Sequence, residues 1–184
     1  MNSKKLLGIG FCFGIATVLF GLVHYQMNYA DADAVVVGNG KDVLHVLANQ
    51  KDLTILSNLI NTSGLHPILE KLDEVTIIAP TNQAFDRLRT MLGDDAYNRI
   101  IRDRRQLERL LKNHIILNKE SIDEITKEGE LNTFQGASIP VSKSDQGTVR
   151  FNGRASVIPT GSNISTDKGY IHTIDEVMVP DRLE

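Results

Sequence analysis

Histidine is the residue type in this sequence with the widest chemical reach, because an imidazole can bind a metal ion or transfer a proton near neutral pH. The chain has five histidines. His24, His45 and His66 lie far apart, and no pair of histidines shows a metal-ligand spacing such as H-x-x-x-H. The sequence therefore predicts no metal site and no bound cofactor.

The two remaining histidines lie in apolar surroundings. His114 follows a helical stripe and precedes the apolar run 115–117. This position favours a buried, hydrogen-bonded ring, and a ring that contacts a partner is the alternative. His172 alternates with Ile171 and Thr173 along an expected strand, so we expect its side chain at the surface or half-buried.

The sequence shows no arrangement of side chains that suits acid–base or nucleophilic catalysis. Asp73-Glu74, Asp123-Glu124 and Asp175-Glu176 are adjacent pairs, and adjacent side chains on a strand or helix point apart. No serine lies in a G-x-S-x-G turn, and no glycine-rich loop precedes a helix as a phosphate site. Cys12, the only cysteine, lies inside an apolar stretch, so the rest of the chain has no thiol. We predict no catalytic residue and no enzymatic activity.

Charge and composition restrict the partners. The 184 residues include 20 basic and 23 acidic side chains, a net charge of −3, and no tryptophan. A nucleic-acid surface needs a concentrated basic face, so we expect no nucleic-acid partner. The segment 94–111 carries several arginines, but acidic residues are interleaved among them. A solvated helix face with local ion pairs is the favoured interpretation, and contact with an anionic surface is the alternative.

The N-terminus indicates export. Lys4 and Lys5 precede residues 6–23, a stretch of 18 residues without a charge. At about 1.5 Å per residue, a helix of this length spans about 27 Å, close to the thickness of a bilayer core. We therefore expect residues 1–34 to be a cleaved signal peptide or a membrane anchor with its tether. Both alternatives place residues 35–184 outside the cytoplasm, in the periplasm, on the cell surface or secreted.

The first half of the remaining chain has mainly helical periodicity, interrupted by one β-branched run that reads as a buried strand. Ser63-Gly64 is a helix C-terminal signal. Asp42 is a candidate N-cap for the first helix. The predicted elements are helices over 42–47, 53–61, 67–72, 83–88 and 94–111, with a strand over 74–79 that Pro80 ends.

From Asn113 the pattern changes to short strands separated by glycine-containing turns. A helical turn over 121–125 interrupts them. Helices followed by a series of hairpins indicate a single α+β domain. The predicted strands are 114–117, 129–134, 138–142, 148–151, 155–158, 164–166 and 170–179, the last ended by Pro180.

Three segments resemble the motifs of the fasciclin (FAS1) domain family. Residues 76–85, TIIAPTNQAF, resemble its first box, and residues 169–180, GYIHTIDEVMVP, resemble its second. Residues 110–116, LLKNHII, resemble the central motif, where the family usually has Tyr-His and this chain has Asn113-His114. The resemblance covers residues 41–180, the whole expected domain.

The resemblance implies a β-wedge or β-sandwich with an N-terminal helical layer. It implies adhesion or protein interaction outside the cytoplasm rather than catalysis, with a protein or cell-surface component as the partner. The membrane is a further partner if residues 6–23 are retained. A binder of a small apolar ligand or lipid, held in a pocket between helices and sheet, is the alternative. The central motif makes Asn113, His114 and Ile115 the candidate partner-binding residues, although the missing tyrosine puts an adhesive role of this motif in doubt.

The boxes also have expected structural roles. Phe85 and the isoleucines of both boxes should be core, and Val177 and Val179 should pack in the last strand. Thr81 and Asn82 can satisfy free N–H groups of a helix, and Asp175 can bind backbone donors near a turn. We expect the His114 ring to be hydrogen-bonded near Thr81 or Asn82. The residues with expected structural roles are Thr76, Pro80, Thr81, Asn82, Phe85, His114, Ile174, Asp175 and Pro180.

Overall fold

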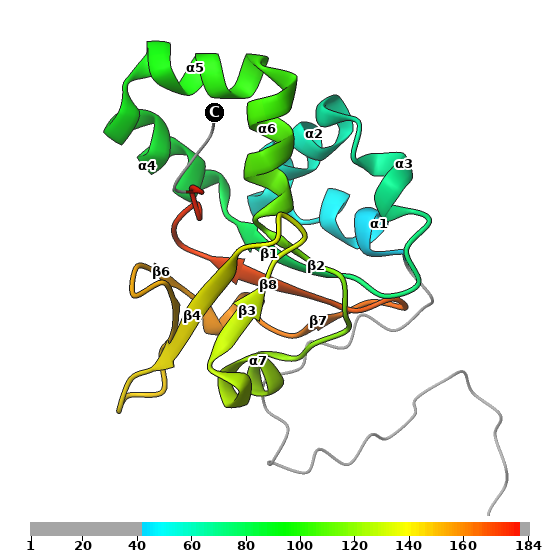
Figure 1. Cartoon of the computed structure of the whole chain (residues 1–184), viewed down its shortest axis with the longest axis vertical. Helices are drawn as coiled ribbons and strands as arrows, with labels where there is room; N and C mark the ends of the chain where they lie inside the picture. The colour runs from blue at the N-terminus through cyan, green and yellow to red at the C-terminus, as the bar shows by residue number, and fades with distance from the viewer. Residues whose placement is uncertain (1–41, 181–184) are drawn as a thin grey trace, which may run out of the picture. The chain divides into compact units, whose positions relative to one another are not determined.

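A computed structural model describes residues 42–180 of the chain (Figure 1). The predicted export segment, residues 1–34, lies outside the described residues. Most helices are gathered at one end of the domain, and the hairpins of the second half of the chain lie toward the other end (Figure 1). The α-helices are α1 (Val43–Ala48), α2 (Thr54–Ser63), α3 (His66–Leu69), α4 (Asn82–Leu92), α5 (Asp94–Arg102), α6 (Arg104–Lys112) and α7 (Ile122–Glu128).

Within residues 42–180, eight strands form two four-stranded sheets. The first sheet has the order β2-β1-β8-β7, and in it β1 and β8 run parallel, with Ile77 opposite Ile171. The second sheet has the order β3-β4-β5-β6 and is antiparallel throughout. The strands are β1 (Thr76–Pro80), β2 (Ile115–Ile116), β3 (Glu130–Asn132), β4 (Ser138–Lys143), β5 (Val149–Phe151), β6 (Ala155–Ser156), β7 (Ile164–Ser165) and β8 (Tyr170–Ile174). This arrangement confirms the predicted α+β class.

The side chains of Thr81 and Asn82 both satisfy free helix N–H groups, but in different helices. The Thr81 hydroxyl accepts a hydrogen bond from the Ala84 N–H at 3.2 Å and so caps α4. The Asn82 Oδ1 accepts from the Ile55 N–H at 2.9 Å, in the first turn of α2. Because a helix start leaves its first N–H groups without partners, Asn82 joins the start of α2 to the start of α4. Asp42 takes the N-cap position of α1, as predicted, but its side chain makes no capping hydrogen bond.

The predicted single helix over 94–111 is wrong, because the chain breaks at Asp103. This residue has an extended backbone, with ψ at 109°, and it separates α5 from α6. Its carboxylate accepts hydrogen bonds from the N–H groups of Arg105 at 2.9 Å and Gln106 at 3.1 Å. Asp103 therefore caps α6, and the cap compensates for the hydrogen bonds that a continuous helix would have made.

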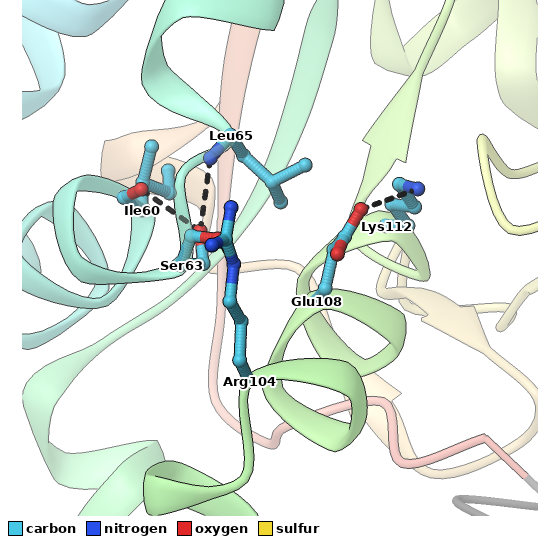
Figure 2. A network of polar contacts seen from close by, with 6 residues as sticks. All are labelled: Ile60, Ser63, Leu65, Arg104, Glu108 and Lys112. Atoms are coloured by element: carbon cyan, nitrogen blue, oxygen red, sulfur yellow. Dashed lines mark hydrogen bonds and ion pairs between the residues drawn. The ribbon is translucent and has the colours of Figure 1, made fainter.

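One of the arginines on this segment has a structural role at the end of α2. Gly64 ends α2 in the left-handed region, with φ at 83°, as its C-terminal signal predicts. Arg104 reaches from α6 to this end, and its Nε donates to the Ser63 carbonyl at 3.2 Å (Figure 2). One turn further along α6, Lys112 pairs with Glu108 at 2.8 Å (Figure 2). A cation at a helix C-terminus also interacts favourably with the negative end of the helix dipole.

The large apolar residues of the first box lie in the core. Ile77, Ile78 and Phe85 are each no more than 2% exposed, as predicted. Strand β8 ends at Ile174, five residues before the predicted end, and Val177 is only half-buried. Val179 is 37% exposed, so its expected core position is wrong. The segment after Ile174 leaves the sheet and follows its own path.

Candidate functional site

His114 lies between the end of α6 and the start of β2, and its side chain is buried. Its Nδ1 bonds the Leu110 carbonyl at 2.8 Å, and its Nε2 bonds the Met178 N–H at 2.9 Å. The predicted partners near Thr81 or Asn82 are therefore wrong. The ring instead connects α6 to the segment 175–180, because the turn after α6 directs it toward Met178.

These two hydrogen bonds define the protonation state of His114. Nε2 accepts from a backbone N–H, so Nδ1 must carry the proton that is donated to Leu110. Burial lowers the pKa of His114 to about 4, because a charged ring would lose its hydration. The imidazole is therefore neutral at physiological pH and holds one fixed tautomer.

Asn113 completes the attachment of the same segment. Its Nδ2 donates to the Met178 carbonyl at 2.8 Å, so Asn113 and His114 together hold both main-chain polar groups of Met178. Asn113 is 3% exposed, and its Oδ1 has no hydrogen-bond partner. Among the described residues, Asp42 is the only other one with such an unpaired buried atom. Leaving a buried acceptor unpaired costs about 1–3 kcal/mol.

A groove lies beside this attachment, between α4, the strands β4 and β5, and the segment 175–180. Its volume is about 790 Å³. Leu88 and Met91 line it from the helix, Ile139 and Phe151 from the sheet. Of the three candidate partner-binding residues, Asn113 lines the groove, while His114 and Ile115 are buried elsewhere in the core.

Apolar side chains are concentrated at the rim of this groove. Met91 is 62% exposed, Leu92 36% and Val179 37%. Together with Ile68 and Leu117, they are the exposed large hydrophobic residues of the described chain, so three of these five lie at one groove. The sequence does not reveal this site, because its walls come from segments that are far apart in the chain.

Charged side chains also line the groove. Arg87 donates to the Asp175 carbonyl at 3.2 Å, which directs its guanidinium toward the segment 175–180. Arg154 lies 3.8 Å from the Glu176 carboxylate, and both side chains are well exposed. Exposed ion pairs of this kind contribute little to stability, so these groups are free to contact a partner.

His172 is completely buried, and its predicted surface position is wrong. Strand β8 lies between β1 and β7, so both of its edges are paired, and the burial of all residues from 171 to 174 shows that both of its faces are covered. The ring's Nδ1 accepts from the Asn163 N–H at 3.0 Å, and its Nε2 donates to the Glu120 carbonyl at 2.9 Å. Burial lowers the pKa of His172 to about 4 as well. The Asn163 Oδ1 accepts from the Ile122 N–H at 2.9 Å, at the start of α7.

The remaining box residues stabilise junctions of the fold. The buried Thr76 hydroxyl donates to the Asn118 carbonyl at 2.8 Å and accepts from the Glu120 N–H at 3.0 Å. The Asp175 carboxylate accepts from the Ser156 N–H at 2.6 Å, in line with its expected role. These hydrogen bonds give Thr76 and Asp175 structural roles. Pro180 lines the groove.

Two further properties concern residues 42–180 alone. No group of three His, Cys, Asp or Glu side chains gathers there in a geometry that could hold a metal ion. None of the helices in this part of the chain is long and apolar enough to cross a membrane.

The architecture defines a class of protein, a single α+β domain with a helical layer over two small sheets. The family model of the fasciclin domain matches residues 51–180, and the chain belongs to this family. The solved structure of a FAS1 domain pair from the insect cell adhesion molecule Fasciclin I is similar, with a TM-score of 0.57 and 26% sequence identity. That similarity covers 71% of this chain and 46% of the other.

Relatives are found in animals and in bacteria. Transforming growth factor-beta-induced protein ig-h3 of Sus scrofa is 28% identical over 149 residues, which is 81% of this chain and 21% of that protein. Human periostin is 29% identical over 149 residues, which is 81% of this chain and 17% of that protein. Protein sll1483 of Synechocystis sp. is 24% identical over 171 residues, 93% of this chain and 91% of that protein. The chain thus spans about a fifth of the length of the animal ig-h3 proteins.

Proposed function

We propose that this chain is a non-enzymatic adhesion or protein-interaction module, and that a protein partner docks at the groove between α4 and the segment 175–180. The observation that carries the proposal is the position of the exposed apolar residues, because Met91, Leu92 and Val179 lie at the rim of one groove. Apolar side chains gathered around a concave site are a feature of protein-binding surfaces. The adhesion molecule named in the similar insect structure supports the same function.

Site-specific photo-crosslinking in the producing cells tests this proposal. A benzophenone amino acid is placed at Met91 or Val179, and in matched controls at Ile68 or Leu117, which are exposed apolar residues outside the groove. We expect a discrete protein adduct from the two groove positions and none from the controls. Equal adducts at all four positions, or none at any, would contradict docking at the groove.

We propose in addition that the domain lies outside the cytoplasm. The support is the charge-free stretch 6–23 that follows Lys4 and Lys5, together with the family membership. A reporter enzyme that is active only in the cytoplasm, fused after Glu184, should therefore be silent. Full activity of that fusion would refute export, and a fusion to residues 42–184 without the leader is the positive control.

A binder of a small apolar ligand or lipid is the second candidate function. The groove favours it in one respect, since about 790 Å³ lies within the range of about 300–1,000 Å³ that small-molecule sites occupy. Native mass spectrometry of the purified chain distinguishes the two functions. A co-purified small molecule that is lost after Leu92→Asp at the groove, but kept after Ile68→Asp at a similarly exposed position outside it, would favour the ligand over the protein partner.

A further inference from the structure

We propose that the partner inserts a tryptophan or tyrosine side chain into the groove, and that the N–H or O–H of this side chain donates a hydrogen bond to the Asn113 Oδ1. This inference rests on the proposed protein docking at the groove and names the chemistry of the contact. Its basis is one unpaired acceptor, the apolar walls beside it, and two arginines on the same lining.

The acceptor is the first step of the argument. Asn113 is held in place because its Nδ2 donates to the Met178 carbonyl at 2.8 Å, so the amide cannot turn over to satisfy its other end. The Oδ1 is left as an acceptor without a donor, and the residue borders the groove. Buried polar groups in native proteins are nearly always paired, so an unpaired one beside a binding groove indicates a missing donor.

The walls are the second step. Leu88, Ile139 and Phe151 line the same groove as Asn113, so the group that carries the donor should itself be mainly apolar. Lysine and arginine also carry donors, but the lining already holds two cations, Arg87 and Arg154, against one carboxylate, Glu176. Serine and threonine are too small to cover the walls. Tryptophan and tyrosine combine a large apolar body with one polar donor.

The arginines are the third step, and they favour an aromatic group over an aliphatic one. Arg87 and Arg154 both line the groove, and a guanidinium stacks favourably on an aromatic face. Arg87 is further directed by its hydrogen bond to the Asp175 carbonyl. Tryptophan, tyrosine and arginine are also the residues that most often dominate the affinity of protein interfaces.

Matched pairs of probes test the donor directly. The full-length chain, ¹⁵N-labelled in lipid nanodiscs, is titrated with N-acetyl-tryptophanamide and with its 1-methyl-indole derivative, which lacks the N–H. A second pair is N-acetyl-tyrosinamide and its O-methyl ether. We expect each parent probe to shift the amide signals of Asn113 and Met178. For at least one pair, the methylated member should bind roughly two- to tenfold more weakly, as the loss of one hydrogen bond implies.

Asn113→Leu is the matching variant, because it keeps the size of the side chain and removes the acceptor. In this variant the two members of each pair should bind with equal affinity. The comparison of probes in the unchanged chain does not depend on how well the variant folds. A control substitution, Asn61→Leu at an exposed position of α2 outside the groove, should leave the preference for the parent probe intact.

Two results would overturn the inference. Equal affinity of both members of both pairs would show that the donor has no role, and unchanged groove signals with all four probes would show that no aromatic side chain enters. Crosslinks at Met91 and Val179 separate these failures from a failure of the proposed function. If those crosslinks form while the probes fail, the partner docks on the rim without a buried aromatic group.

Discussion

The two buried histidines lie in regions of opposite character. His172 lies in the interior of the first sheet, beside Asn163. Both ring nitrogens of His172 are hydrogen-bonded, one to the Asn163 N–H and one to the Glu120 carbonyl, and the Asn163 Oδ1 accepts from the Ile122 N–H. His114 lies beside Asn113, whose Oδ1 has none, and this pair borders a groove with an apolar rim. Both rings are neutral and both connect distant segments. Burial of a histidine therefore does not by itself indicate a binding site here, and the proposed site is instead identified by the unpaired atom next to one of the two rings.

The largest expected effect is common to both regions and is driven by acid. Burial lowers the pKa of both rings to about 4, while an unfolded histidine titrates near 6.5. Between these two pH values the unfolded chain binds protons that the folded chain does not. The free energy of unfolding should therefore fall as the pH falls through this window, by roughly 3 kcal/mol for each ring.

Two measurements check this effect. Urea unfolding at a series of pH values between 7.5 and 4.5 should show the loss of stability. In the folded chain, NMR of the ring carbons should show neither His114 nor His172 titrating above pH 5. A buried ring that titrates near 6.5 would contradict its enclosure.

Replacing each histidine by alanine should cost a similar amount of stability but have different effects on the groove. His114→Ala leaves the Met178 N–H unpaired, and His172→Ala leaves the Asn163 N–H unpaired, each with a cavity, so we expect losses of about 2–4 kcal/mol. At a temperature where both variants remain folded, His114→Ala alone should weaken binding at the groove, because Met178 forms part of its wall. Equal binding by both variants would remove the distinction between the two regions.

The two asparagines give a smaller but sharper contrast. Asn163→Leu should destabilise by about 2–3 kcal/mol, because the Ile122 N–H loses its acceptor and the backbone has a φ of 52°, which a branched apolar residue tolerates poorly. Asn113→Leu should cost less, about 1 kcal/mol, because the Met178 carbonyl loses its donor but the unpaired Oδ1 is removed at the same time. Thermal unfolding of both variants checks this, and a large loss at Asn113 would show that its Oδ1 is paired in solution.

The smallest effect is expected at the rim. Met91→Gln replaces a side chain that is already 62% exposed, so the stability should change by no more than about 0.5 kcal/mol. Binding at the groove should fall nevertheless, since the rim loses apolar area that a partner would cover. A substitution that lowers stability and binding together would instead make Met91 part of the fold.

The sequence predicts most of the fold because its signals are local. Apolar periodicity, Gly64 and the β-branched run before Pro80 each depend on a few neighbouring residues, and the structure agrees with them. The break at Asp103 could not be predicted in this way. An aspartate within a helical pattern can face solvent inside one helix or cap the start of a second helix, and the same sequence pattern fits both. His172 was misplaced because alternation assumes one solvated face, whereas β8 has neighbours on both edges and cover on both faces.

The candidate site is harder to predict because it depends on assembly. The central motif directs attention to Asn113, but nothing in the sequence shows that its partner is Met178 or that one of its atoms remains unpaired. Leu88, Ile139 and Val179 become neighbours of one groove only after the helical layer and the hairpins have come together. Asn113 and Asn163 are the same residue type, and only their hydrogen bonds distinguish them. The Oδ1 of Asn163 has a donor, whereas the Oδ1 of Asn113 has none.

The parallel pairing of β1 with β8 has a consequence for the order of folding. Ile77 lies opposite Ile171, so the first sheet joins the beginning of the domain to its end. Contacts between residues so far apart form late, because a long loop must close before they contribute. While the chain emerges from a ribosome, β1 can pair with β2 but not yet with β8. The native sheet therefore closes only once residues 170–174 have been synthesised.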